Sequence, residues 1–150
     1  MGDEEREQKL FTLKEAERTR AEVEPILVEA IEKRRKQMNV AERLAEIGQR
    51  ISFSGGMTIS YDEAAELRLE HNNLLQSVKS ALERIESTGC VVKDLDVGLL
   101  DFPSIVNNEE VYLCWRLGED RIRFYHRQDE GFAGRKPLDP RDAGPPNIIQ

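Results

Sequence analysis

His126 is the residue of this sequence with the most direct route to metal chemistry. Asp129 follows it by three positions, and Asp101 lies in an apolar stretch predicted to form a neighbouring strand. A neutral imidazole flanked by carboxylate oxygens can bind a divalent metal ion, so Asp101, His126 and Asp129 are candidate metal ligands. The spacing is not diagnostic. The alternative, which we favour, is a buried histidine hydrogen-bonded to a carboxylate or backbone group.

A second candidate site would bind a small acidic ligand. Its candidate residues are Asp101, Arg116, Arg123 and Arg135. Guanidinium groups grip phosphate or carboxylate oxygens in pairs, and backbone N–H groups at Gly131 and Gly134 could approach the same anion. The segment from Gly131 to Arg135 lacks the Lys-Ser/Thr ending of a phosphate-binding loop, however.

The same segment has a structural interpretation, which we also favour. It would be a C-terminal strap whose glycines permit a tight turn. In that arrangement Phe132 enters the core, and Arg135 pairs with Asp101 or Glu119. The choice between strap and anion pocket depends on whether the arginines converge.

Four short strands are predicted after Gly89, where apolar residues alternate or run together. They are Val91–Leu95, Val97–Phe102, Val111–Arg116 and Arg121–His126. The last two are expected to pair across Leu117–Asp120, so that Val111 faces His126 on the side that covers the helices. Cys114 would then lie on the opposite side from His126, which disfavours a Cys–His catalytic pair. No Gly-x-Ser-x-Gly motif supports hydrolase chemistry either.

Before Gly89 the apolar residues recur every three or four positions, which predicts helices. The first begins at Thr12, because Thr12 and Glu15 fit a capping box that satisfies two backbone donors. Pro25 lacks a backbone N–H and should kink or break this helix. The long piece then spans Ile26–Arg50.

The second helix is predicted over Tyr61–Ser87, with a capping box at its start and Gly89 as its C-terminal cap. Its length matches Ile26–Arg50, so the two should form an antiparallel hairpin. His71 would meet Arg34, Gln37 and Met38 on the seam, where polar groups can fix register. A small sheet covers one flank of such a hairpin, and the remaining apolar width predicts a homodimer.

Composition limits the functional classes. The 22 basic and 29 acidic residues give a net charge of -7, which disfavours nucleic-acid and anionic-membrane partners. Two cysteines are too few for a disulfide framework and are expected to be reduced thiols. No apolar run is long enough to cross a bilayer, and the acidic N-terminus is unlike a signal peptide. We therefore expect a cytoplasmic protein.

Several sequence segments, taken in their order along the chain, carry a resemblance to a known family. They are Phe11-Thr12-Leu13, GCVVKDLDVGLLDFP from Gly89, VYLCWRLGE from Val111, His126, and GFAGRKPL from Gly131. Together they resemble a bacterial family classed as a domain of unknown function, over Leu10–Leu138. Tyr125 departs from the Trp of that family. The resemblance implies this architecture in a bacterial cytoplasm, and it assigns no activity, cofactor or catalytic residue.

The sequence thus predicts an α+β fold: a long antiparallel helical hairpin packed with a small antiparallel β-sheet and a C-terminal strap. Its parts are a flexible N-terminus (1–11), the hairpin (12–88), the sheet region (89–138) and a disordered tail (139–150). The favoured function is a non-enzymatic module for self-association or small-ligand binding, with a protein partner also open. The alternative is a metal-dependent or anion-binding enzyme that uses the polar cluster of the sheet region, with a divalent metal as its cofactor.

Overall fold

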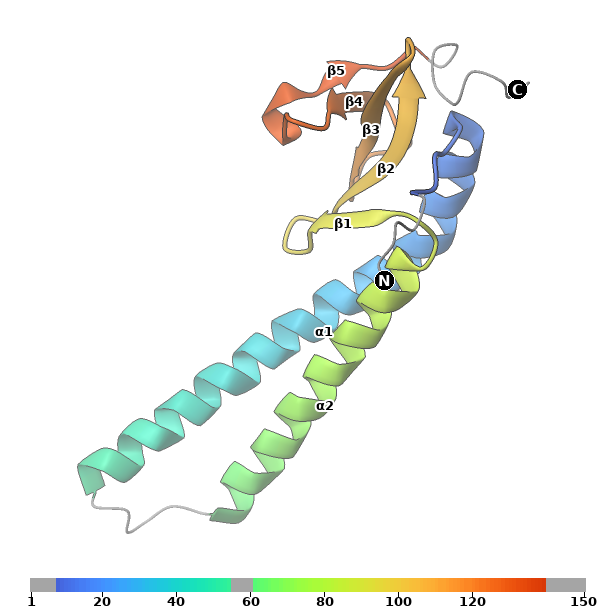
Figure 1. The fold of residues 1–150 in the computed structure, drawn as a ribbon. Helices are drawn as coiled ribbons and strands as arrows, with labels where there is room; N and C mark the ends of the chain where they lie inside the picture. The colour runs from blue at the N-terminus through green and yellow to red at the C-terminus, as the bar shows by residue number, and fades with distance from the viewer. Residues whose placement is uncertain (1–7, 55–60, 140–150) are drawn as a thin grey trace, which may run out of the picture.

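The computed structural model describes residues 8–54 and 61–139, so expectations for 1–7, 55–60 and 140–150 lie outside it. Two antiparallel helices precede a five-stranded antiparallel sheet of order β1-β2-β3-β4-β5, which confirms the predicted α+β hairpin and sheet (Figure 1). The elements are α1 (Leu13–Ser54), α2 (Tyr61–Glu86), β1 (Val91–Asp94), β2 (Leu99–Val106), β3 (Glu109–Arg116), β4 (Phe124–Arg127), the 3₁₀ helix η1 (Phe132–Gly134) and β5 (Lys136–Pro137). In these ranges no helix combines the length and apolar character that a membrane span requires.

Local signals mark both ends of the hairpin. The Thr12 N–H donates to Glu15 Oε1 at 2.9 Å, and the Glu15 N–H donates to Thr12 Oγ1 at 3.0 Å, which is the predicted capping box. After α2, Gly89 has φ +96°, the left-handed conformation expected of a C-terminal cap.

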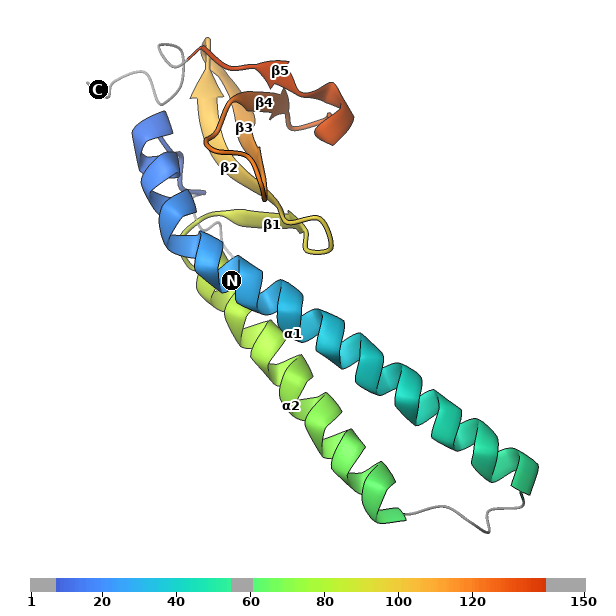
Figure 2. The ribbon, with the colours of Figure 1, turned by 180° about the vertical axis from the view of Figure 1, so that it is seen from behind.

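Pro25 kinks α1 without breaking it, so the helix is continuous from Leu13 to Ser54. Both views show the first turns of α1 running along the sheet and the remainder turning away beside α2 (Figure 2). Ala21, whose carbonyl loses its helical donor to the proline, and Pro25 itself are both exposed. Water can therefore replace the missing hydrogen bond, and the helix bends instead of ending.

The core lies between the sheet and the sheet end of the hairpin. Val23 and Leu27 of α1 and Ile85 of α2 pack with Leu100 and Trp115, and all five side chains are at most 1% exposed. Further out along the hairpin, no strand covers the described parts of the two helices (Figure 1). The hairpin therefore has a root embedded in the core and an arm that projects from it.

The segment before α1 differs from the expectation of a flexible N-terminus at Phe11. Its ring is fully buried and meets Phe102 edge-on at 5.4 Å between ring centroids. Its N–H donates to the Pro103 carbonyl at 2.7 Å, and its own carbonyl accepts from Ser104 Oγ at 2.6 Å. A large buried ring with both backbone groups bonded anchors the chain to β2.

The predicted register between the third and fourth strands is wrong by one residue. Tyr112, and not Val111, lies opposite His126, and Cys114 lies opposite Phe124. Because side chains alternate across a strand, this shift moves His126 from the helix-facing side of the sheet to the other side. Strand pairing also starts later than predicted, at Phe124, because the Ile122 N–H donates to Glu17 of α1 at 2.8 Å.

Candidate functional site

Three polar side chains meet on the face of the sheet that points away from the core. They are Asp101 of β2, Cys114 of β3 and His126 of β4, called the buried triad below. Asp101 and Cys114 are direct cross-strand partners, and His126 comes from the next strand. Their potential ligand atoms all lie within 4.8 Å of one another, and the residues are 0%, 0% and 1% exposed. The sheet register alone creates this cluster.

Hydrogen bonds fix how His126 is oriented. Its Nδ1 lies 2.9 Å from the Arg127 carbonyl oxygen, and its Nε2 lies 3.1 Å from each carboxylate oxygen of Asp101. A carbonyl can only accept, so Nδ1 carries a hydrogen. One further proton then occupies the contact between Nε2 and Asp101, either as an imidazolium–carboxylate pair or on a neutral carboxyl. In both states the pair is neutral overall.

Burial governs the acidity of the triad. It raises the pKa of Asp101, and the nearby His126 opposes that rise. Burial, reinforced by the Asp101 charge, raises the pKa of the Cys114 thiol to about 12. The thiol therefore stays protonated near neutral pH and donates a hydrogen bond to Asp101. Each member of the triad thus has a polar partner, as buried groups require.

The triad corrects two expectations from the sequence. Cys114 and His126 share a face, so the reason for setting that pair aside was wrong. Asp101 does contact His126, whereas Asp129 is exposed after β4 and is not part of the cluster. The predicted set of Asp101, His126 and Asp129 is therefore brought together only in its first two members, and Cys114 occupies the third place.

Arg135 connects the strap that follows β4 to the rest of the sheet region. Its Nη2 donates to both carboxylate oxygens of Glu119 at 2.8 Å, as one of the two predicted pairings required. The guanidinium lies 4.1 Å from the centre of the Phe124 ring and 4.5 Å from that of Phe132. Phe132 itself is 39% exposed, so the expectation that it enters the core was wrong. It instead covers Arg135 from outside.

The four residues of the predicted acidic-ligand site do not converge. Asp101 is sealed within the triad, and Arg135 is committed to Glu119. Arg116 is exposed over Phe132, at 5.9 Å from its ring centre. Arg123 forms a paired contact with Asp120 and lines a separate hollow against the start of α1. The structure therefore brings Arg116 and Arg135 to the same ring, Phe132, and leaves Asp101 and Arg123 apart from them.

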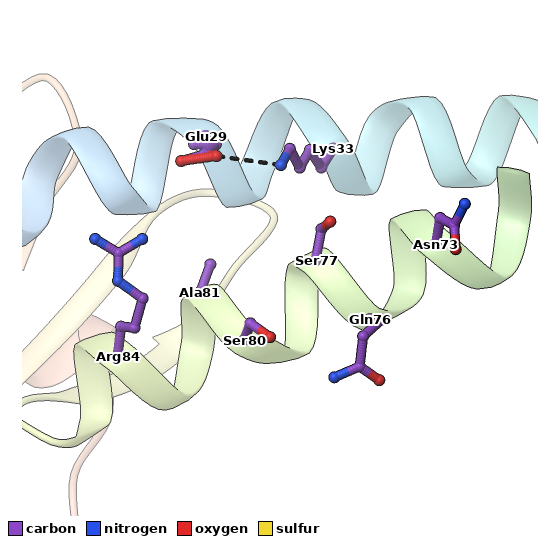
Figure 3. Close-up of a pocket in the computed structure, with 8 residues that line it drawn as sticks. All are labelled: Glu29, Lys33, Asn73, Gln76, Ser77, Ser80, Ala81 and Arg84. Carbon is purple, nitrogen blue, oxygen red and sulfur yellow. Dashed lines mark ion pairs between the residues drawn. The ribbon is translucent and has the colours of Figure 1, made fainter.

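The hairpin carries its own polar features. Of the three residues expected to meet His71, Gln37 does so, with its Nε2 2.9 Å from His71 Nε2. Arg34 instead pairs with Asp96 at 2.9 Å, and Met38 is 54% exposed. Nearer the root, a groove between the helices is lined by polar or small side chains, with Lys33 paired to Glu29 at 3.1 Å (Figure 3). Ser77 of α2 points toward α1 in this view. The groove adds further hydrogen-bonding groups along one side of the seam.

The molecule is therefore a helical-hairpin protein whose small sheet holds a closed polar triad. Residues 9–138 match a family described as an uncharacterized conserved protein, DUF2203, and the chain belongs to that family. Comparison with curated proteins and with solved structures found no match. The family relationship covers both the hairpin and the sheet, and it assigns neither of them a function.

Proposed function

We propose that this protein is a non-enzymatic, cytoplasmic interaction module that self-associates through the arm of its hairpin. The arm comprises residues 32–54 of α1 and 61–80 of α2. Large apolar side chains at Met38, Leu69 and Leu75 are 54%, 62% and 45% exposed, and this exposure is the observation that carries the proposal. A pair of helices covers only one stripe of each, so apolar residues outside that stripe need another surface.

Few side chains hold the two arm helices together. Among the described residues of the arm, the buried hydrophobic side chains are Val40, Ile47, Ala64 and Val78. Of these, Val40 and Val78 have small side chains, and the side chain of Ala64 is a single methyl group. A second copy that packs against the arm would add a further apolar seam, as in a four-helix bundle.

Charge supports a second copy as the partner. The α1 part of the arm carries six basic and three acidic residues, whereas the α2 part carries two basic and four acidic residues. In a two-fold bundle with alternating helices, α1 of each copy would lie beside α2 of the other. Opposite charges would then flank every seam, as Arg43 and Glu63 already do within one chain at 3.1 Å.

The sheet region supports a non-enzymatic assignment. The buried triad is closed to solvent, so its groups can hold a proton or an ion but cannot touch a substrate in this conformation. Cys90 and Cys114 are both free and buried, which suits a reducing compartment. In this proposal the sheet region supports the hairpin, and the arm of the hairpin makes the contact with the second copy.

Light scattering after size exclusion tests the proposal at micromolar concentration. The wild-type protein should have the mass of a dimer, and the Met38→Glu/Leu75→Glu variant the mass of a monomer. Phe132→Glu is the matched control, because Phe132 is 39% exposed but lies in η1 of the strap and not on the arm. It should remain a dimer. A monomeric wild type, a dimeric double variant, or dissociation by Phe132→Glu would each contradict the proposal.

A further inference from the structure

We propose that the buried triad is a binding site for one divalent transition-metal ion of the zinc type. The ligands are a carboxylate oxygen of Asp101, Sγ of Cys114 and Nε2 of His126. The donor set of one thiolate, one imidazole and one carboxylate is among those that zinc accepts. This site is independent of the proposed arm interface, which lies on the helices.

The distances suit a metal ion. Tetrahedral bonds of about 2.0–2.3 Å separate neighbouring ligand atoms by about 3.3–3.8 Å. In the triad, Nε2 already lies 3.1 Å from the Asp101 oxygens, and all three ligand atoms fall within 4.8 Å of one another. Displacements of about 1 Å would complete the geometry. Three strands of one sheet hold the ligands, so their backbone positions are fixed before the ion arrives.

The hydrogen bond that would orient His126 as a metal ligand is already formed. A histidine that binds zinc through one nitrogen usually donates the other N–H to a carbonyl or carboxylate. His126 Nδ1 faces the Arg127 carbonyl at 2.9 Å, which leaves Nε2 as the nitrogen directed at Asp101 and Cys114. This orientation is the one that a metal ligand needs, and it requires no change of tautomer when the ion binds.

Charge balance favours exchange of protons for the ion. Without metal, the Cys114 thiol holds one proton and the Asp101–His126 contact holds another, so the triad is neutral. With metal, the thiolate and carboxylate carry two negative charges, and the divalent ion neutralises both. Each ion therefore displaces two protons, and the buried site stays neutral in either state.

Charged side chains of β1 and of the strap act on the triad. Lys93 of β1 and Arg135 of the strap face the triad, and Glu119 is paired with Arg135 at 2.8 Å. Cys90 lies within the electrostatic reach of Asp101 but outside the ligand cluster. The half-buried Tyr112 ring contacts His126, at 5.5 Å between ring centroids, and Lys93 Nζ lies 5.9 Å from its centre.

Cobalt titration of the chelator-treated full chain tests the site, because Co²⁺ reports thiolate ligation by a charge-transfer absorption. We expect saturable binding of one Co²⁺ per chain, displacement by Zn²⁺, and a rise in the thermal unfolding midpoint on saturation. Cys114→Ser should lose the charge-transfer band. Cys90→Ser is the matched control, because Cys90 is equally buried, and it should retain the band.

A second measurement keeps the test decisive if Cys114→Ser fails to fold. Equilibrium dialysis should find one Zn²⁺ per chain in the wild-type protein and in Cys90→Ser, and none in Asp101→Asn, which removes one ligand charge at nearly constant volume. Absence of saturable binding, one Zn²⁺ per chain in Asp101→Asn, a band that persists in folded Cys114→Ser, or loss of the band in Cys90→Ser would each overturn the metal site.

Discussion

Removal of the His126 side chain tests how the sheet tolerates its buried charge. His126→Ala in metal-free protein leaves the fully buried Asp101 carboxyl without the imidazole that lies 3.1 Å from both its oxygens. Breaking a buried pair by deleting one partner costs about 3–5 kcal/mol of unfolding free energy. The Arg127 carbonyl also loses its donor, so the upper part of that range is expected.

The other histidine provides the matched control. His71 is half-buried on the hairpin seam and contacts Gln37 through one hydrogen bond at 2.9 Å. His71→Ala should therefore cost only about 1 kcal/mol. Urea denaturation measures both variants, with fluorescence of the single and fully buried Trp115 as the probe.

The pH dependence of the His126→Ala penalty gives the sharper test. Burial raises the pKa of Asp101, and removal of His126 takes away the largest opposing influence. The folded variant then holds a proton on Asp101 at pH values where the unfolded chain has released it, so its stability falls as pH rises above about 4. The penalty should be smallest near pH 4 and grow toward neutrality. A penalty that equals that of His71→Ala, or that does not change with pH, would refute this reasoning.

Two further predictions concern the thiols and the glycines. In metal-free protein the pKa of both buried thiols is raised, that of Cys114 to about 12, so above about pH 9 the unfolded chain loses thiol protons that the folded chain keeps. Unfolding free energy should then fall by about 1.4 kcal/mol per pH unit for each thiol, and Cys90→Ala should halve that slope in urea titrations; an unchanged slope would contradict the burial argument. Gly48→Ala should stabilise α1 by about 1 kcal/mol, because a Cβ there meets nothing within 4 Å. Gly98→Ala should destabilise by more than about 1 kcal/mol, because φ is +72° and the new Cβ would lie 2.7 Å from Leu117 Cβ, and thermal melts that rank the two variants otherwise would contradict it.

Helical features were predictable from the sequence because their signals are local. The capping box at Thr12 and the cap at Gly89 each depend on a few adjacent residues, and both form as expected. The contact between Gln37 and His71 followed from the equal lengths of the two helices. Whether Pro25 bends or breaks α1 could not be decided in advance, since it depends on which side of the helix faces water.

The buried triad was not predictable, because it depends on a register that the alternation of residues does not determine. Phe124 and Tyr125 are consecutive aromatic residues, so the strand fits the sheet with either face inward. The connection after β3 decides the matter through contacts distant in sequence: the Leu117 N–H donates to the Gly98 carbonyl, and the Ile122 N–H to Glu17. The first bond ties the connection to the residue before β2, and the second ties it to α1. The resulting shift of one residue brought His126 to Cys114.

The unbroken course of α1 through Pro25 links two regions that a sequence-based division would separate. Its first turns cover one side of the sheet, and its later turns form half of the arm. A chain truncated to begin after Pro25 would expose Leu100 and Trp115 to water, since Val23 would no longer cover them. Proteolysis or deletion within the first turns of α1 should consequently leave the sheet joined to the arm through α2 but with part of its core side uncovered, so that the shortened chain aggregates.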